Sequence, residues 1–181
     1  NELATNPDFI TSWELIDSIK KPLIAAVDGI AFGGGNELLL MCDIILASKE
    51  AKFSQPEINL GLICGGGGTQ RLTTKIGKNW AMEMCLTGNI VSAEEAKNIG
   101  LVNHIYDASK LIKHALDLAN EISLKPIEAI ISTKKLIKDA SKVHKDGLTA
   151  ERAKFMQLLK TDNCIEGMNA FKERRKPQFK N

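Results

Sequence analysis

The sequence contains no apolar run that approaches the roughly 20 residues of a membrane-spanning helix. The apolar stretch at residues 38–47 is interrupted by Asp43 and is far too short. An excess of charge of one sign is also missing, because 24 basic and 22 acidic residues leave a net charge of +2. A general nucleic-acid-binding surface is therefore not indicated. We expect neither a membrane span nor a nucleic-acid partner.

Motifs for metals and nucleotides are missing as well. The cysteines and histidines are scattered along the chain: Cys42, Cys64, Cys85, Cys164, His104, His114 and His144. No Cys-x-x-Cys or other zinc-ligand spacing occurs among them, which favours reduced, structural cysteines in an intracellular protein. Neither glycine cluster completes Gly-x-Gly-x-x-Gly, and no Lys-Ser/Thr follows at the Walker spacing.

The 181 residues, 44% hydrophobic and 25% charged, suit a single globular domain that buries most of its apolar surface. Short apolar runs predict buried strands at residues 23–27, 43–47, 51–54 and 101–106. Helices are expected before Pro22, at residues 37–42, and almost throughout from residue 79 onward. Ser92 and Glu95 form a capping-box pattern, and Gly100 would close that helix. The fold class is therefore α/β, with a core at residues 1–123 and a helical region at residues 124–181.

A glycine turn precedes the first acid of interest. Gly33, Gly34 and Gly35 permit positive φ and a close approach of the backbone to a ligand. A helix that begins just after them would direct an amide at a bound oxygen, which is how an oxyanion site is built from the backbone. Glu37 would lie in the first helical turn beside that site. The alternative is a tight strand-to-helix turn whose glutamate favours the helix start.

A second acid follows 20 residues later. Glu57 comes after Pro56 and precedes a mostly apolar segment, where burial would raise its pKa and suit a proton donor. Gly65 begins a four-glycine cluster that would pack closely against a ligand or against Glu57. A surface carboxylate and a plain flexible loop are the alternatives. Two acids beside glycine turns favour proton transfer at a polarised carbonyl.

Longer segments carry a family resemblance. They are residues 21–29, 31–38, 42–45, 53–57, 67–72, 86–88 and 167–177. The chain from about Asp17 onward resembles the crotonase, or enoyl-CoA hydratase/isomerase, superfamily, and within it the short-chain enoyl-CoA hydratases. The resemblance implies the crotonase ββα-spiral with a C-terminal helical region that builds trimers, commonly paired into hexamers.

The resemblance also implies roles for single residues. Gly34 would donate an oxyanion-hole amide to the thioester carbonyl, while Glu37 and Glu57 match the two catalytic acids that activate water and exchange the Cα proton. Gly33 and Gly65 would belong to the substrate-binding residues, the latter through a backbone that helps hold the water. Phe171 and Arg174 would reach the CoA moiety of a neighbouring subunit. The alternative for residues 172–176 is a solvated basic chain end.

The sequence departs from the family pattern at two places. Cys64 stands where the family usually has proline before the water-binding glycine, so the turn would be less rigid and Cys64 could line the pocket. The chain starts at Asn1, just beyond the expected position of the family's N-terminal third. That third carries an Ala-Gly-x-Asp segment whose alanine amide is the second oxyanion donor. We therefore expect either a fragment or a truncated homologue.

The favoured function is reversible syn-hydration of a trans-2-enoyl-CoA to the 3-hydroxyacyl-CoA in fatty-acid oxidation. No metal or redox cofactor is expected, because the CoA thioester itself activates Cα and Cβ. The predicted partners are the acyl-CoA substrate and further copies of the chain, in the mitochondrial matrix or the cytoplasm. The alternatives are a truncated, inactive homologue that acts as a structural subunit, and another crotonase enzyme such as an isomerase or a 3-hydroxyacyl-CoA hydrolase.

Overall fold

The computed structural model describes residues 8–140 and 145–179. The helices are α1 (Asp8–Asp17), α2 (Gly34–Leu40), α3 (Gly68–Ile76), α4 (Lys78–Thr87), α5 (Ala93–Asn98), α6 (Ala108–Ser123), α7 (Ile127–Ala140), α8 (Lys145–Leu158), α9 (Asp162–Lys172) and the 3₁₀ helix η2 (Pro56–Leu60). The strands are β1 (Ile24–Val27), β2 (Ile30–Phe32), β3 (Ile44–Ser48), β4 (Lys52–Ser54), β5 (Val91–Ser92) and β6 (His104–Tyr106).

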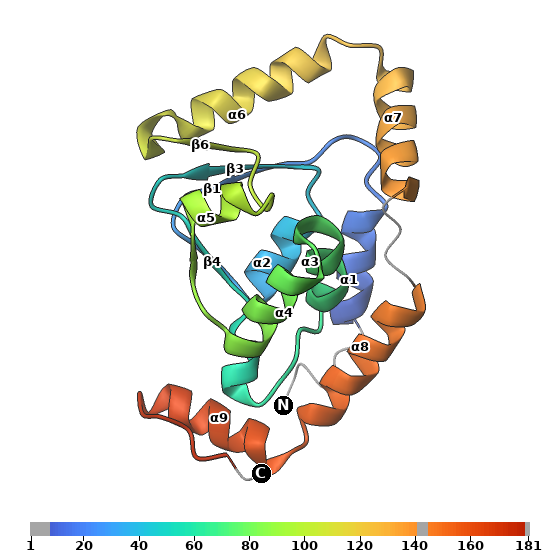
Figure 1. Cartoon of the computed structure of the whole chain (residues 1–181). Coiled ribbons are helices and arrows are strands. Elements are labelled where there is room, and N and C mark those ends of the chain that lie inside the picture. Colours follow the sequence, from blue (N-terminus) through green and yellow to red (C-terminus); the bar gives the residue numbers. More distant parts are fainter. Residues whose placement is uncertain (1–7, 141–144, 180–181) are drawn as a thin grey trace.

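The strands form two small sheets, in the orders β1-β3-β6 and β2-β4-β5. Consecutive strands go to different sheets: β1 pairs with β3 in parallel, and β2 pairs with β4 in parallel. Each pair of strands is followed by a short helix, α2 after β2 and η2 after β4. The chain therefore repeats a strand–strand–helix unit, and successive units stack. Because β2 and β4 pair in parallel, both end at the same edge of their sheet, which places the starts of α2 and η2 next to each other (Figure 1).

The main core lies between the sheets and helices α2 to α5. Its largest fully buried apolar side chains include Ile45, Phe53, Leu72, Met84 and Leu101. Ile45 lies on β3, a mostly apolar and buried strand, whereas Phe53 lies on β4 between the exposed Lys52 and the buried Ser54. This core fixes the two ends of the glycine segment at residues 65–68, because Phe53 precedes η2 and Leu72 lies on α3.

The predicted strands at residues 23–27, 43–47, 51–54 and 101–106 all occur; β1, β4 and β6 are shorter than expected, and β3 is shifted by one residue. The capping box is also confirmed: Ser92 and Glu95 exchange both capping hydrogen bonds, and Gly100 has a φ of 84°. The structure places one helix, α3, ahead of residue 79, where no helix was expected. It also adds two strands, β2 and β5, and a 3₁₀ helix that contains Glu57. These three elements have five residues or fewer, which is too short for a hydrophobic period to be visible in the sequence.

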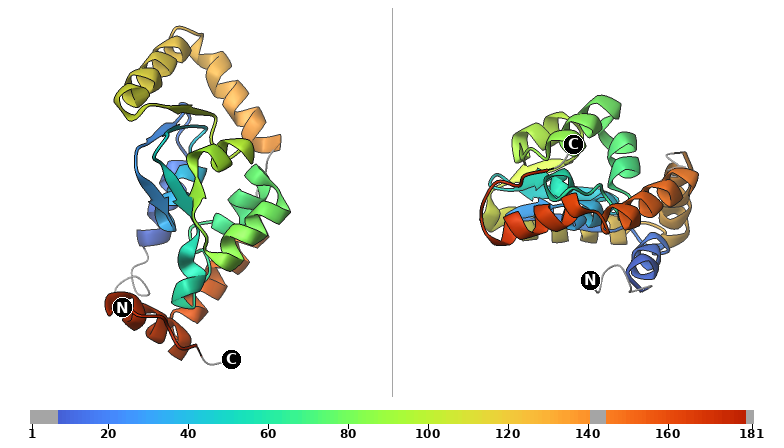
Figure 2. Two further views of the ribbon diagram at one scale, coloured as in Figure 1. Left: turned by 60° about the vertical axis from the view of Figure 1, so that its left-hand side comes forward. Right: turned by 90° about the horizontal axis from the view of Figure 1, so that it is seen from below.

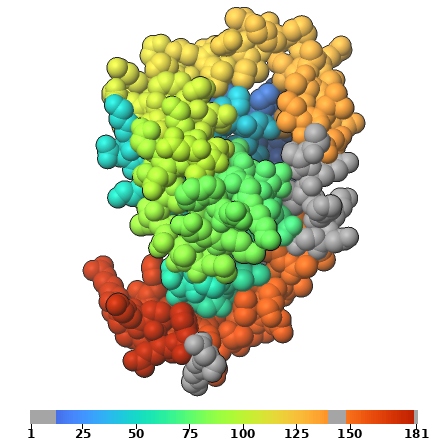
Figure 3. Space-filling model, in the orientation of Figure 1, coloured from blue at the N-terminus to red at the C-terminus, as the bar shows by residue number. Residues whose placement is uncertain are grey.

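Helices α6 to α9 run around the core rather than forming a bundle of their own. Helix α6 lies across the β1-β3-β6 sheet, and α8 approaches α3 (Figure 2). Helix α9 packs on η2, where backbone meets backbone: a Cβ on Gly61 would lie 2.9 Å from Asn163, and one on Gly167 would lie 2.7 Å from Leu60. Figure 3 shows the η2 segment between α8 and α9.

Candidate active site

Glu37 lies in the first turn of α2 and only 3% of its surface is exposed. Its Oε1 accepts two backbone hydrogen bonds, from the Gly66 N–H at 2.8 Å and the Gly68 N–H at 2.7 Å. The side chain leaves no room for Cβ atoms there, since one on Gly66 would lie 3.0 Å from Oε2. Glycine is therefore required at residue 66, so that the N–H groups of Gly66 and Gly68 can reach the Glu37 carboxylate.

A third glutamate holds the other amides of the same segment. Glu151 on α8 is 5% exposed, and its carboxylate accepts from the Gly67 N–H at 2.7 Å and the Thr69 N–H at 2.8 Å. The Thr69 hydroxyl donates to the same carboxylate. One turn further along α8, Phe155 covers Gly65, where a Cβ would lie 2.8 Å from the aromatic ring. Helix α8 thus fixes the glycine segment from the side opposite Glu37.

Glu57 lies in the first turn of η2 and is oriented by two amide side chains. The Gln55 Nε2 donates to both of its carboxylate oxygens, at 3.1 and 3.3 Å. Gln55 is itself fixed, because its Oε1 accepts from Asn36 Nδ2 at 2.6 Å and both residues are completely buried. Gly33, with a φ of 52°, lies against the acid: a Cβ there would come within 3.2 Å of the Glu57 Oε1.

The two acids converge. One carboxylate oxygen of Glu37, one of Glu57 and the Cys64 Sγ all lie within 4.8 Å of one another. Because α2 and η2 occupy equivalent places in successive repeat units, residues 20 positions apart meet at one point. This spacing leaves room for one small molecule, such as water, that contacts both acids.

The pKa values of both acids are raised. Burial raises the pKa of Glu37 from 4.5 to about 7, against the lowering effect of the Gly68 amide, and the negative charges of Glu57 and Glu151 raise it further. Burial also raises the pKa of Glu57, although its own backbone amide and Gln55 offset part of the change. The pair can therefore hold one proton near neutral pH, which is the state that a paired acid and base need.

A cavity of about 300 Å³ opens beside Glu57. Its polar lining includes Gln55, Glu57 and Thr69, and its lining also includes the apolar side chains of Ile58, Ile63, Met82 and Leu86 and the thiols of Cys64 and Cys85. Such a mixture suits a ligand with an apolar chain and one reactive polar end.

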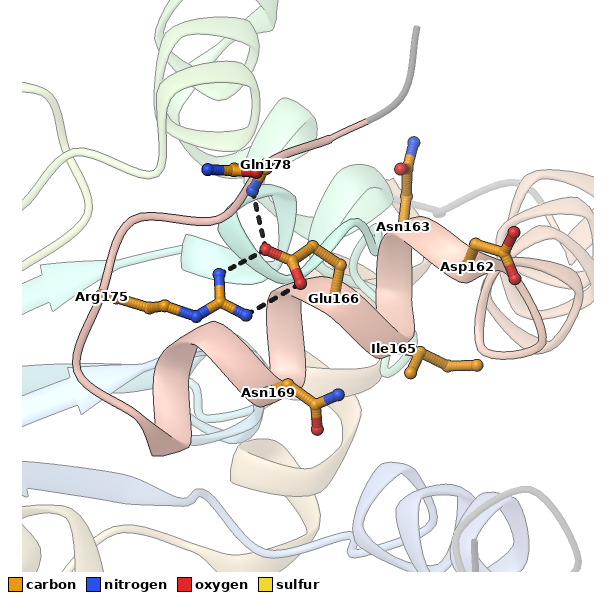
Figure 4. A pocket seen from close by; sticks show the side chains of 7 residues that line it. All are labelled: Asp162, Asn163, Ile165, Glu166, Asn169, Arg175 and Gln178. Atoms are coloured by element: carbon orange, nitrogen blue, oxygen red, sulfur yellow. Dashed lines mark hydrogen bonds and ion pairs between the residues drawn. The ribbon is translucent and has the colours of Figure 1, made fainter.

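A second cavity, of about 450 Å³, lies along α9 and shares no lining residue with the first (Figure 4). Its Glu166 and Arg175 are already paired: Glu166 accepts from two guanidinium nitrogens of Arg175 at 2.5 and 2.9 Å and from the Gln178 N–H at 2.8 Å. The pKa of Glu166 is lowered to about 2 by these bonds. This cavity forms where the C-terminal segment folds back along α9. We therefore place the candidate active site in the first cavity.

The structure brings five of the seven predicted site residues into one region. Gly33 and Gly34 precede Glu37, and Gly65 adjoins the amides that Glu37 binds. Gly34 begins α2, and a Cβ added there would meet nothing within 4 Å. Phe171 lies in the last turn of α9 and Arg174 lies just beyond the end of that helix, and neither lines the cavity beside Glu57. Phe171 is 76% exposed, and its role at a subunit contact stays a prediction.

Sequence reasoning missed Glu151, Gln55 and Cys85. Gln55 lies two residues before Glu57 and directly before Pro56, which marks a turn. The sequence therefore placed Gln55 near the predicted acid but did not show that its side chain points toward that acid. Glu151 is 84 residues from Gly67 along the chain, and no local pattern predicts that contact.

Within residues 8–140 and 145–179, no helix is long and apolar enough to cross a membrane.

Comparison with known proteins identifies the family. Residues 2–181 match the family described as enoyl-CoA hydratase/isomerase, and the chain belongs to it. Its α/β fold is the crotonase spiral expected from the sequence: an enoyl-CoA hydratase from Mycobacterium avium subsp. paratuberculosis superposes with a TM-score of 0.91 at 30% identity, covering 96% of this chain and 71% of that chain.

Two curated relatives show the range of names in the family. The mitochondrial enoyl-CoA hydratase of Pongo abelii is 44% identical over 95% of this chain and 60% of its own length. The 2,3-dehydroadipyl-CoA hydratase of Escherichia coli is 38% identical over 93% of this chain and 66% of its own length. The chain thus spans 60% and 66% of the lengths of these two relatives.

Proposed function

We propose that the protein catalyses the reversible syn-hydration of a trans-2-enoyl-CoA to the 3-hydroxyacyl-CoA. The observation that carries this proposal is the convergence of two carboxylates with raised pKa values, the buried Glu37 and the half-buried Glu57, beside a mostly apolar cavity. The naming of relatives as hydratases supports the same reaction class. A hydratase needs two proton-transfer groups, whereas the family's isomerases commonly keep only the acid equivalent to Glu57.

In this mechanism the pair begins with one proton. Water between the two acids gives a proton to the ionised carboxylate as its oxygen bonds to Cβ. The protonated carboxylic acid gives its proton to Cα on the same face. The electron pair of the double bond passes through the thioester, whose developing oxyanion accepts from the Gly34 N–H. The pair ends with one proton again, on the other acid, and exchange with solvent resets it.

The remaining assignments extend this proposal. Gly33 and Gly65 shape the backbone around the thioester and the water, and Phe171 and Arg174 contact the CoA moiety of a neighbouring copy. Exposed apolar side chains on α6 and α7 support an assembly of several copies, the trimer or hexamer expected from the sequence: Ile112, Leu116, Ile127, Leu136 and Ile137. No bound metal or redox group takes part, and the compartment is the mitochondrial matrix or the cytoplasm.

The test is product analysis with trans-2-butenoyl-CoA in ¹⁸O-labelled water. The proposal predicts a 3-hydroxybutyryl-CoA that carries the label at the Cβ oxygen, with the thioester intact. Release of free CoA would indicate a hydrolase. Conversion of a 3-enoyl-CoA to the 2-enoyl-CoA without gain of water would indicate an isomerase. No turnover of any of these thioesters would contradict an enzymatic role and favour a structural subunit.

A further inference from the structure

A chain of side-chain hydrogen bonds links the buried side of α2 to Glu57. Asn36 on α2 and Gln55 directly before η2 are both completely buried. The Asn36 Nδ2 donates to the Gln55 Oε1 at 2.6 Å, and the Gln55 Nε2 donates to the two Glu57 carboxylate oxygens at 3.1 and 3.3 Å. Gln55 lines the cavity beside Glu57 and Asn36 does not, so the proposed hydration gives Asn36 no part.

The ionised form of Glu57 fixes the direction of both amides. An ionised carboxylate only accepts hydrogen bonds, so Gln55 must turn its Nε2 toward Glu57. Its Oε1 then points to Asn36 and needs a donor, which the Asn36 Nδ2 supplies. The bonds therefore run in one direction, from Asn36 through Gln55 to Glu57. This direction matches the ionised acid, because a protonated acid would donate to an amide oxygen instead.

The Asn36 amide keeps this direction although it leaves one of its own atoms unsatisfied. Its Oδ1 is buried and has no hydrogen-bond partner in the part of the chain that the structure describes. An unsatisfied buried acceptor costs free energy, and apolar side chains in place of both amides would avoid that cost. Packing alone thus does not account for the two amides, whereas the hydrogen bonds that Gln55 gives to Glu57 do.

Much of the surroundings of Glu57 disfavours its charge. Burial raises its pKa and the negative charge of Glu151 raises it further, while its own backbone amide and the Gln55 side chain lower it. Helix α9 meets η2 backbone to backbone, at Gly61 and Gly167. The titratable groups that face Glu57 or line its cavity come from the other elements: Glu37 on α2, Cys64, Cys85 and Lys78 on α4, and Glu151 on α8. Gln55 is thus the side-chain donor that offsets burial at Glu57.

We propose that Asn36 is a positioning residue for Glu57: it holds the Gln55 amide with its N–H groups toward the acid, which fixes the carboxylate in place and favours its ionised form. Without the Asn36 donor, Gln55 can turn its Oε1 toward Glu57 and accept from the protonated acid. The acid pair would then lose its ionised member at a higher pH. The effect on hydration rests on the proposed function, whereas the positioning of Glu57 does not.

The direct test is the pKa of Glu57, measured by ¹³C NMR of protein labelled at the glutamate side-chain carboxyl carbons. Glu57→Gln identifies the Glu57 signal by its loss. In Asn36→Leu the pKa of Glu57 should rise by about one pH unit, as expected when a hydrogen bond to the charged form is weakened. Gln55→Leu should raise it at least as much. The double variant should go no further than Gln55→Leu, because Asn36 acts through Gln55.

Two more variants complete the test. Asn36→Ser, whose side chain is too short to reach the Gln55 Oε1, should shift the pKa in the same direction, and it serves if Asn36→Leu does not fold. Ser48→Ala is the matched control. The Ser48 Oγ is also buried without a partner in the described residues, but Ser48 lies on β3 and does not line the cavity. It should leave the pKa of Glu57 unchanged.

An unchanged pKa of Glu57 in the Asn36 variants overturns the proposal, as does a shift that Ser48→Ala reproduces or one that adds in full to that of Gln55→Leu. In a second arm, the acid limb of the pH profile of kcat/KM should move to higher pH by the shift that NMR measures. A lower rate with the limb in place overturns the role of Asn36 in hydration. A protein that shows the NMR shift but hydrates no thioester contradicts the proposed function and leaves the positioning of Glu57 standing.

Discussion

The carboxylates of Glu37 and Glu151 bind alternate amides of one short segment from opposite sides. Glu37 accepts from Gly66 and Gly68, and Glu151 accepts from Gly67 and Thr69. Each acid holds only two of the four amides, so neither fixes the segment alone. The segment is therefore fixed only when α8 is docked, and α8 becomes part of the support for the candidate catalytic acid.

Glu151→Gln tests this support. Its amide presents a donor where Thr69 needs an acceptor, so we expect a loss of about 1–3 kcal/mol in the free energy of unfolding. The negative charge of Glu151 raises the pKa of Glu37, so its removal should move the alkaline limb of the kcat/KM profile to lower pH. A merely structural role would leave that limb in place. Glu121→Gln, on the exposed surface of α6, is the control and should change neither quantity.

The pH profile of kcat/KM reports the proton held by the pair. Hydration needs one protonated and one ionised carboxylate, so activity should be bell-shaped. The alkaline limb should fall near pH 7, where Glu37 loses its proton, and the acid limb should lie lower. The measurement is the initial rate at substrate concentrations far below KM. A profile that is flat from pH 5 to 9 would contradict a pair of acids as the proton-transfer groups.

Stability should depend on pH through the same group. The pKa of Glu37 is about 7 in the folded protein against 4.5 in the unfolded chain. Its contribution to folding is thus fully present below pH 4.5 and is lost as the pH rises through 7, by up to about 3 kcal/mol. Glu37→Gln removes this loss, since its Oε1 can accept from both amides. Urea unfolding at pH 5 and pH 8 should show the variant gaining relative to wild type at pH 8. Equal pH dependence of the two proteins would refute the buried charge.

Gly167→Ala tests the docking of α9 on η2. The added Cβ would lie 2.7 Å from the Leu60 backbone, and relief of that clash should cost about 1–3 kcal/mol despite the higher helix propensity of alanine. Because η2 carries Glu57, activity should fall as well. Gly35→Ala is the control for stability, since its Cβ would meet nothing within 4 Å and should be tolerated. Unchanged unfolding of Gly167→Ala would show that α9 does not depend on this contact.

Local chemistry made much of this structure predictable. Buried apolar runs predicted β1 and β3, and Ser92 with Glu95 predicted the start of α5. In each case the residues that carry the signal are close neighbours in the sequence. The glycine turns pointed to Glu37 and Glu57 for a similar local reason. The family resemblance, rather than any pattern, supplied their joint role.

Other parts depend on contacts that distant segments create. Nothing around Glu151 or Phe155 marks them as supports of the glycine segment, since their partners lie more than 80 residues away. The meeting of Cys64 and Cys85 arises only when α4 packs beside η2. Strands β2 and β5 form because each pairs with β4, which imposes an extended conformation on short segments that have weak preferences of their own.

Hydration of trans-2-butenoyl-CoA by the wild type, Glu37→Gln, Glu57→Gln and the double variant compares the two acids in one experiment. The rate is followed by loss of the ultraviolet absorbance of the conjugated thioester. Each single variant should lose 10²- to about 10⁴-fold in kcat, and the double variant should lose little more, because the acids act as a unit. Turnover that survives both single substitutions at the wild-type rate would contradict the assignment of Glu37 and Glu57 as the catalytic pair.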